Sequence, residues 1–325
     1  MRVAITGATG VLGRRLVEAF DDAGHEVLGL VRDDVGAATV EAHGGTPNRG
    51  DVLDRSSLAD VVADVDVAVH AATAIPTETK PDPEAWARND RIRVEGMRNL
   101  LAAGDDLDRV LFPSVVWVAR QPDGGRYDET APRHPDRSTA GAAEVERLLL
   151  EGEIGPAATV LRLGLFYSHD DATTRTLASN LLSGRQPIVG RGLLGRRCGA
   201  LSRIHPTDAA AAFVAAVEAE VSGLFHVVDE EPVGLDDFLV ALADRLDASK
   251  PGPRLPAWLA RFLLGPTATD LISRPMPTDA TRFREATGWE PTLATYREGL
   301  DRVVERWRAA GTVERDDGAV RWVEE

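Results

Sequence analysis

The sequence predicts an α/β protein, built on a doubly wound parallel sheet with a smaller and mostly helical C-terminal lobe. Three observations lead to this fold class. The chain has 325 residues, which is too long for one small core and suits one large domain or two interlocked ones. Hydrophobic residues make up 43% of the chain and recur with strong periodicity, as in a globular protein. The first 31 residues read as a strand, a glycine-rich turn, a helix and a second strand.

The opening strand–helix–strand unit follows from its apolar pattern. Val3 to Thr6 form a short, largely apolar strand, and Glu26 to Val31 form a second one. Between them, residues 11–24 place apolar side chains on one helical face and end at a glycine, a common helix stop. Two strands joined through a helix are expected to lie parallel in one sheet.

The turn between the first strand and the helix carries Gly7, Gly10 and Gly13 at GxxGxxG spacing. Gly7 permits a tight turn, Gly10 lets the backbone approach a pyrophosphate, and Gly13 lets the helix pack close to the strand. The phosphates would lie at the helix N-terminus, where free N–H groups and the helix dipole favour an anion. The spacing therefore predicts a Rossmann dinucleotide site. Its residues in this segment are expected to be Gly7, Thr9, Gly10, Val11, Leu12 and Gly13.

The end of the second strand favours one form of the cofactor. Folds that bind NAD usually place Asp or Glu there to hold the ribose 2′-hydroxyl, whereas this chain has Val31 followed by Arg32. A guanidinium matches a 2′-phosphate in a bidentate manner. NADP(H) is therefore favoured. NAD(H) stays open, because Arg32 can instead stack over the adenine while Asp33 takes the hydroxyl.

Composition argues against several classes of partner. A net charge of −15 disfavours nucleic acid and anionic membranes, and this carboxylate-rich, lysine-poor chain resembles halophilic proteins. No apolar run reaches the roughly 18 residues of a membrane span, and no cluster has metal-ligand spacing. Cys198 is the single cysteine, so we expect no disulfide framework and a cytoplasmic location. Because the chain opens on a strand, no leader segment is expected.

With these residues, the sequence resembles the short-chain dehydrogenase/reductases, in particular their extended branch of nucleotide-sugar epimerases, dehydratases and related reductases. The resemblance covers nearly the whole chain. The segments that resemble the family's third to sixth strands are NRGDVLDRSSL, VDVAVHAATAIP, RVLFPSVVWVA and TVLRLGLFYSHDD. The segment VEGMRNLLAAG resembles the family's long helix. The segments that resemble its C-terminal half are LSRIHPTDAAAAFVAAVE, GLFHVVDEEPVGLDDFLVALADRL and FREATGWEPTLATYREGL. The stretch WARNDRIRVEGMRNLL is also similar to an atypical subset, from which only fold and cofactor binding carry over.

The resemblance implies further cofactor contacts at the strand ends. Asp51 and Val52, after the third strand, would lie beside the adenine. Ala71, Ala72 and Thr73, after the fourth strand, would lie along the cofactor. These five residues complete the expected cofactor site.

Candidate catalytic and substrate-binding residues are also implied by the resemblance. Ser114 occupies the family's catalytic Ser/Thr position and could hold a substrate oxygen, although a capped strand end is the alternative. Tyr167 matches a tyrosine that usually borders the substrate. The candidate substrate-binding residues are Arg93, Arg191 and Arg203. Two alternatives stay open: Arg93 pairs with Glu95 or a neighbouring aspartate, and the arginine-rich segment is only a solvated loop.

The chain departs from the family at its catalytic pair, a Tyr-x-x-x-Lys motif in which the lysine lowers the pKa of the phenol from about 10. Aligned by its ETAP entry and its later Glu146, this chain has Ser138 at the tyrosine and Ala142 at the lysine. No Tyr or Lys occurs between residues 128 and 166. Arg93 also replaces the asparagine that opens the family's NVxGTxNLL motif. The sequence therefore predicts an atypical member.

We expect the helix within residues 136–150 to remain for packing. Residues 148–150 would continue its apolar face, while Glu144 and Glu146 would face water. Tyr127 can offer a phenol from a loop, but an anchor for that loop is its expected role.

The expected organisation divides the chain into five segments. They are a Rossmann domain (1–165), a lobe segment (166–203), a return to the Rossmann core (204–228), the remaining substrate lobe (229–311) and a C-terminal tail or appended strand (312–325). A homodimer stays open as the oligomeric state.

Three functions remain open at this point, because a fold does not fix a function. The first is an NAD(P)(H)-dependent oxidoreductase acting on a small carbonyl, alcohol or sugar-type substrate by non-standard proton transfer. The second is a nucleotide-sugar epimerase or dehydratase, against which the lost pair argues. The third is an NADP(H)-binding sensor or scaffold without hydride chemistry. Because Ser114 and Tyr167 remain, we favour an enzyme with a small-molecule substrate.

Overall fold

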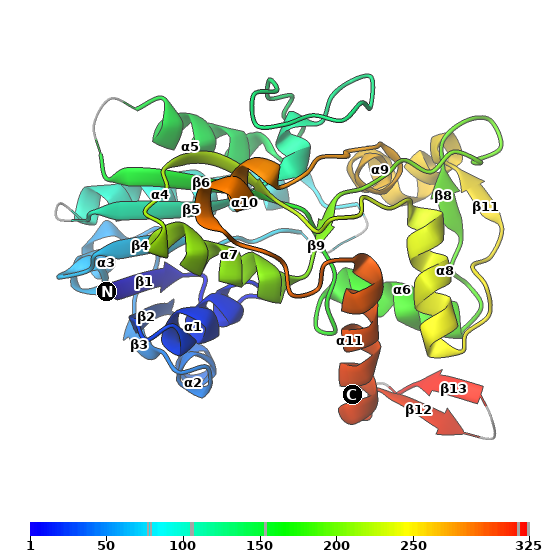
Figure 1. The fold of residues 1–325 in the computed structure, drawn as a ribbon, viewed down its shortest axis with the longest axis horizontal. Helices are drawn as coiled ribbons and strands as arrows, with labels where there is room; N and C mark the ends of the chain where they lie inside the picture. The colour runs from blue at the N-terminus through cyan, green and yellow to red at the C-terminus, as the bar shows by residue number, and fades with distance from the viewer. Residues whose placement is uncertain (77, 79, 105–106, 153–154, 317–318, 324–325) are drawn as a thin grey trace.

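The structure is a computed structural model that describes every residue except 77, 79, 105–106, 153–154, 317–318 and 324–325. Its centre is a seven-stranded sheet in the order β10-β6-β5-β4-β1-β2-β3, with all neighbouring strands parallel (Figure 1). The strands are β1 (Arg2–Thr6), β2 (Glu26–Val31), β3 (Thr46–Arg49), β4 (Val67–His70), β5 (Arg109–Val115), β6 (Ala157–Leu163) and β10 (Gly223–Val227). The predicted doubly wound parallel sheet is confirmed.

Helices cover both faces of this sheet, which explains why its central strands are apolar on both sides. One face carries α1 (Gly13–Asp22), α2 (Asp34–Ala42) and α7 (Pro206–Glu218). The other carries α3 (Arg55–Val62), α4 (Pro83–Ala103) and α5 (Ala140–Leu150). A short 3₁₀ helix, η1 (Val116–Ala119), follows β5.

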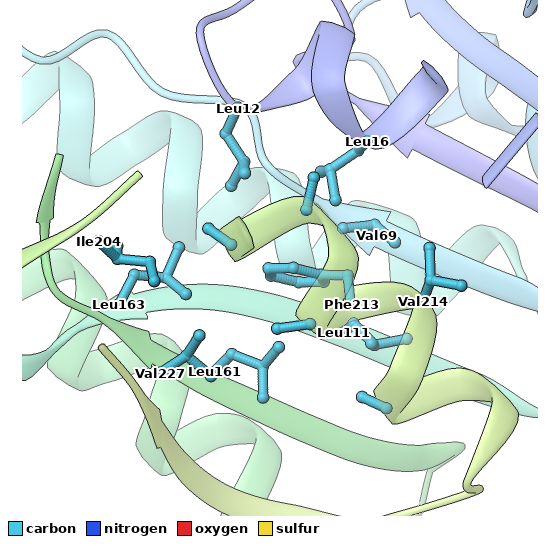
Figure 2. Close-up of a cluster of buried hydrophobic side chains, with 14 of the residues drawn as sticks. Leu12, Leu16, Val69, Leu111, Leu161, Leu163, Ile204, Phe213, Val214 and Val227 are labelled. Atoms are coloured by element: carbon cyan, nitrogen blue, oxygen red, sulfur yellow. The ribbon is translucent and has the colours of Figure 1, made fainter. Parts of the chain in front are cut away.

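The core beneath α1 and α7 fixes the return crossover on the sheet. Figure 2 shows the apolar side chains that meet there: Leu12, Leu16, Val69, Leu111, Leu161, Leu163, Ile204, Phe213, Val214 and Val227. Each is at most 9% exposed. Burial of one such side chain is worth about 1.5–3 kcal/mol of transfer free energy, so this layer holds α7 and β10 in the sheet domain.

A second core lies in the lobe beside the sheet (Figure 1). Its helices are α6 (Ala172–Leu182), α8 (Leu235–Leu246), α9 (Ala257–Ser273) and α11 (Tyr296–Ala309). A short parallel pair accompanies them, β8 (Ile188–Gly190) with β11 (Arg254–Pro256). A second pair, β7 (Leu165–Phe166) with β9 (Arg203–Ile204), packs its apolar residues against the sheet core. The lobe is mostly helical, as predicted.

One element departs from the predicted division of the chain. Residues 229–311 are expected in the lobe, yet α10 (Thr281–Thr287) packs against the sheet. The Phe283 ring lies 5.6 Å, centroid to centroid, from Phe225 of β10. A short helix such as α10 has no local feature that indicates which of the two cores it packs against. The sequence therefore could not predict that α10 packs on the sheet.

The C-terminal segment forms a hairpin on the lobe rather than a single strand. Strands β12 (Val313–Asp316) and β13 (Ala319–Trp322) pair antiparallel. The Trp322 ring packs edge-on against Trp307 of α11, with centroids 5.2 Å apart. Within the described residues, no helix is both long and apolar enough to cross a bilayer.

Candidate functional site

The glycine turn adopts the geometry that its spacing predicts. Gly7 has a φ of +70°, and a Cβ there would lie 2.6 Å from the backbone of Ala71 and Ala72. A Cβ at Gly13 would lie 1.9 Å from the carbonyl oxygen of Gly7. The N–H of Gly10 donates to that same oxygen at 3.0 Å. The turn therefore closes only with glycine at positions 7 and 13.

Gly10 differs from the other two glycines because the space beside it is open. A Cβ there would meet only the Gly7 carbonyl oxygen within 4 Å, at 3.4 Å. Thr9 and Gly10 are exposed and Val11 is half-buried, whereas the Leu12 side chain lies in the core. No side chain caps the start of α1. The N–H of Arg14 donates to the carbonyl oxygen of Gly10 at 3.1 Å, and the free N–H groups at this helix start can bind an anion. This open cradle at a helix N-terminus suits the phosphates of a dinucleotide.

The segment after β4 borders the same cradle, and the segment after β3 lies at the same edge of the sheet. Ala71 and Ala72 are half-buried against Gly7, and Thr73 next to them is exposed. Farther along the edge, Asp51 Oδ1 accepts a hydrogen bond from the N–H of Leu53 at 2.9 Å.

Val52 is anchored between that edge and α4. It is 8% exposed, and its carbonyl oxygen accepts a hydrogen bond from Asn99 Nδ2 at 2.9 Å. The structure thus brings together the strand-end segments that the sequence assigns to the cofactor. Their contacts with a cofactor stay predictions.

Arg32 and Asp33 have different surroundings. Asp33 Oδ1 accepts a hydrogen bond from the N–H of Gly36 at 2.7 Å and so caps α2. Arg32 is exposed, and within the described residues only its carbonyl oxygen is engaged, by Arg49 Nη1 at 3.1 Å. The cap occupies the carboxylate that would compete for a ribose hydroxyl, while the Arg32 guanidinium remains available.

Arg32→Ala is expected to narrow a preference for NADPH over NADH by about tenfold, since one charge-assisted bidentate contact is worth about 1.5–3 kcal/mol. Fluorescence titration of both cofactors at constant ionic strength measures the change, because salt screens this contact. The affinity for NADH serves as the internal control and should stay the same. Equal or reversed preference in the unmodified protein would contradict the assignment.

Ser114 lies in a buried polar network with Glu146 of α5. The expectation that Glu146 faces water is therefore wrong. Ser114, 1% exposed, donates from Oγ to Glu146 Oε1 at 2.5 Å. Arg162 of β6 donates to both oxygens of Glu146, from Nε at 2.9 Å and Nη2 at 2.7 Å. Glu146 is 0% exposed and does not face water, whereas Glu144 pairs with Arg98 near the surface. The helical pattern placed Glu146 at the surface, but the pairing with Arg162 of β6 allows it to be buried.

This network gives Ser114 a structural partner instead of an open face. It links β5, α5 and β6, and it continues through His226 of β10, whose ring accepts from Arg162 Nη1 at 3.5 Å. Burial lowers the pKa of His226 to about 3, so the ring is neutral at pH 7. Its Nδ1–H can therefore donate to Thr278 Oγ1 at 2.6 Å. The proposed catalytic role of Ser114 stays a prediction that these contacts do not support.

The tyrosines are equally enclosed. Tyr127 donates from its hydroxyl to the carbonyl oxygen of Val116 at 2.8 Å, which makes it the expected loop anchor. Tyr167 is 0% exposed and lies in the lobe core between His205 and Phe238, with ring centroids 5.8 and 5.7 Å away. Burial raises the pKa of the Tyr167 phenol well above its usual range. Its hydroxyl has no hydrogen-bond partner in the described residues, and its catalytic role stays a prediction.

The two positions of the missing pair lie at the start of α5. Ser138 precedes the helix, and its Oγ donates to Asp136 Oδ1 at 2.6 Å. Ala142 is 1% exposed and packs in the core between the sheet and α4. The N–H of Gly141 donates to Asp90 Oδ1 of α4 at 3.1 Å. These contacts hold α5 in place without a phenol or an amine.

Arg93 is buried on α4 and is not paired with Glu95, which binds Arg91 at 2.8 Å. The carbonyl oxygen of Arg93 accepts from His70 Nε2 at 3.1 Å. Its guanidinium Nε has no hydrogen-bond partner among the described residues, and burial lowers its pKa to about 10. It therefore remains charged at pH 7. A role in substrate binding stays a prediction.

Arg203 and Arg191 occupy contrasting positions. Arg203 is 3% exposed, and its guanidinium carbon lies 3.7 Å from the centre of the Phe238 ring, inside the lobe. Burial lowers the pKa of Arg203 to about 10. Arg191 is exposed and lines a cavity next to α9. Of these two arginines, Arg191 lines this cavity and Arg203 does not.

The sequence analysis did not predict the contacts of Asp170 and Asn89. Asp170, in the segment after β7, pairs with Arg14 and Arg15 at the start of α1, the latter at 2.8 Å. These arginines hold the pKa of Asp170 far below its usual range against the opposing effect of burial. Asn89 is 0% exposed, and its Oδ1 accepts from the N–H of Ala74 at 2.9 Å. Both depend on pairings between distant segments, which no local motif signals.

Comparisons with known proteins identify the fold and the family. Residues 3–227 match the NAD dependent epimerase/dehydratase family. A 3-diazoavenalumate denitrifying reductase from a Streptomyces species is 35% identical over 316 residues, which are 93% of this chain and all of that protein.

Two solved structures have the same fold. A UDP-glucose 4-epimerase from Thermus thermophilus with NAD has a TM-score of 0.77 at 22% identity, covering 95% of this chain and 100% of that one. A human epimerase family protein with NADPH has a TM-score of 0.77 at 18% identity, covering 94% and 99%. This chain belongs to the NAD dependent epimerase/dehydratase family and is an NAD(P)-binding oxidoreductase or epimerase.

Proposed function

We propose that this chain is an atypical NAD(P)H-dependent reductase that delivers hydride to a substrate atom needing no proton from the enzyme. The observation that carries the proposal is the position of the tyrosine and lysine side chains. The chain has only three tyrosines, and all are at most 6% exposed. Its two lysines, Lys80 and Lys250, lie in separate exposed loops. A Tyr–Lys acid–base pair therefore has no source in this chain.

Buried histidines near the sheet do not take over the phenol's task. His70 accepts from Thr6 Oγ1 at Nδ1, 2.8 Å away, and donates from Nε2 to a main-chain oxygen. Burial lowers the pKa of His70 to about 4 and that of His205 to about 3. His205 caps α7 by accepting from the N–H of Thr207 at 3.3 Å. Both rings are neutral at pH 7 and serve the fold.

Without a tyrosine to donate a proton, the group that accepts the hydride must be one that needs no proton from the enzyme. Reduction of a ketone develops an alkoxide that is normally protonated in the transition state. An aromatic diazonium group needs no such proton, because hydride addition to its terminal nitrogen neutralises the charge and gives Ar–N=N–H. That product loses N₂, and its hydrogen passes through solvent to the ring carbon to give Ar–H. The name of the Streptomyces relative, a denitrifying reductase of a diazo compound, supports this class.

The chain's own residues then contribute binding and orientation. A dinucleotide held by its phosphates at the glycine turn would supply the hydride from its dihydronicotinamide ring. Gly10 and the free N–H groups of α1 would hold its phosphates. Asp170 attaches the segment after β7 to the start of α1 through Arg14 and Arg15, which would keep this segment in place when a ligand binds.

The reaction is tested by single-turnover oxidation of NADPH with 4-carboxybenzenediazonium, next to a panel of aldehydes, ketones and nucleotide sugars. We expect oxidation with the diazonium well above the protein-free rate, and none with the panel. The rate should stay flat from pH 5.5 to 7.5, because His70 and His205, with lowered pKa values, are already deprotonated throughout this range.

A double variant provides the control. Ser138→Tyr with Ala142→Lys restores the family motif, but position 142 is 1% exposed, so the new amine must be buried. We expect no gain in ketone reduction and a lower melting temperature. Ketone turnover with a sigmoidal pH profile in the unmodified protein would overturn the proposal. Tight cofactor binding without oxidation by any acceptor would favour a sensor instead.

A further inference from the structure

A cavity of about 450 Å³ lies between the two arms of α9 and the turn after β8. Helix α9 bends at Gly265, which has a φ of 77° and a ψ of 167° and is followed by Pro266. The bend lets Arg261 on the first arm pair with Asp270 on the second, Nη1 to Oδ1, at 2.6 Å. The volume is in the range of small-molecule sites.

The helix that lines the cavity is attached to loops that leave the carboxyl edge of the sheet, where ligands of doubly wound folds bind. The second arm of α9 is attached to the segment after β5, because Arg120 Nη1 donates to the carbonyl oxygen of Asp270 at 2.8 Å. The first arm is attached to the segment after β4, because Lys80 donates to the carbonyl oxygen of Phe262. The segments that follow β4 and β5 therefore contact the helix that lines this cavity.

The charge of the lining is opposite to that of the protein. Arg191, Arg261 and Arg274 line the cavity against the single carboxylate of Asp270, in a chain with a net charge of −15. Arg261 is paired, but the side chains of Arg191 and Arg274 have no ion-pair or hydrogen-bond partner in the described part of the chain. Two free guanidinium groups on one cavity are a binding site for a carboxylate.

The remaining lining is mostly apolar and consists of Gly192, Ala257, Trp258 and Ser273. Trp258 is 54% exposed, and its Nε1 donates to the carbonyl oxygen of Leu193 at 3.4 Å, which orients the indole ring. On the same two segments, Leu193 is 81% exposed and Phe262 is 72% exposed. An exposed indole face favours a planar, conjugated body over a sugar.

We propose that this cavity binds the body of the substrate, and that the substrate is a planar aromatic or conjugated carboxylic acid. Arg191 and Arg274 hold its carboxylate, and Trp258 stacks on its ring. The inference rests on the proposed function, since it assigns the substrate class of that reaction, but its test measures binding alone.

The test is calorimetric titration with trans-cinnamate and with trans-cinnamamide, its neutral counterpart. We expect the acid to bind about tenfold more tightly than the amide, and less tightly as salt rises. Arg191→Gln and Arg274→Gln should each weaken cinnamate about five- to tenfold. Both variants should melt like the unmodified protein, because neither side chain has a described partner to lose.

Arg196→Gln is the matched control, because Arg196 is an exposed arginine of the same turn outside the cavity. It should change the affinity less than twofold. Equal affinity for acid and amide, no binding of cinnamate at millimolar concentration, or an equal effect of Arg196→Gln would each overturn the assignment. So would sedimentation with phosphatidylglycerol vesicles that is lost in Arg274→Gln, since this face would then bind lipid headgroups.

The two proposals fail separately. If cinnamate binds as expected but no acceptor oxidises NADPH, only the reaction is wrong. If the diazonium is reduced with an unchanged KM in Arg191→Gln and Arg274→Gln, only the cavity assignment is wrong.

Discussion

Gly10→Val is expected to weaken cofactor binding about a hundredfold or more while the protein stays folded. A Cβ at position 10 meets only the Gly7 carbonyl oxygen, at 3.4 Å, so the backbone accommodates the side chain. The two methyl groups then occupy the cradle where the phosphates must approach the free N–H groups of α1. Fluorescence titration with NADPH measures the loss, and far-ultraviolet circular dichroism with thermal melting verifies the fold.

Gly13→Val is the contrasting variant. A Cβ at position 13 would lie 1.9 Å from the carbonyl oxygen of Gly7, so the strand and helix must separate and the melting temperature should fall. The two variants thus distinguish loss of a ligand contact from loss of the fold. Unchanged NADPH affinity in a folded Gly10→Val protein would mean that the turn is not the phosphate site.

Glu146→Ala is expected to lower the free energy of unfolding by about 3–5 kcal/mol, because it leaves the Arg162 charge buried without its partner. Arg162 is 1% exposed and Glu146 is 0% exposed, so water cannot replace the lost contacts. The variant also removes the acceptor of the Ser114 hydroxyl. Urea denaturation of both proteins measures the difference.

Glu144→Ala is the control on the same helix. Its carboxylate pairs with Arg98 and Arg147 near the surface, and such a pair is worth about 0–1 kcal/mol. Glu146→Leu combined with Arg162→Met should recover much of the stability, since no charge is then left buried. A Glu146→Ala protein as stable as Glu144→Ala would show that the network does not hold α5.

The fold could be predicted because its signals are local. The strand of Val3 to Thr6, the helix that follows and the glycine turn between them depend on residues within a few positions of each other. A buried parallel strand must be apolar on both faces, and a tight phosphate-binding turn must lack Cβ atoms. These requirements are visible in a single sequence, and the structure meets them.

The site was less predictable because its side chains are paired across the chain. Helical periodicity places Glu146 among solvent-facing positions, and only the approach of Arg162 from β6 makes its burial tolerable. Ser114 retains the expected position on β5 but faces Glu146. A sequence gives the type and position of a side chain, whereas its partner depends on which elements pack together.

By itself, the sequence determined the parallel sheet, the glycine cradle at its first turn and the lack of any tyrosine or lysine between residues 128 and 166, because each is a property of residue identity and short-range spacing. Tertiary structure alone decided which arginine is free and which is buried. Arg203 packs inside the lobe, while Arg191 meets Arg274 on one cavity only because α9 bends at Gly265. Charge and burial arise from contacts between distant segments, and spacing along the chain does not encode them.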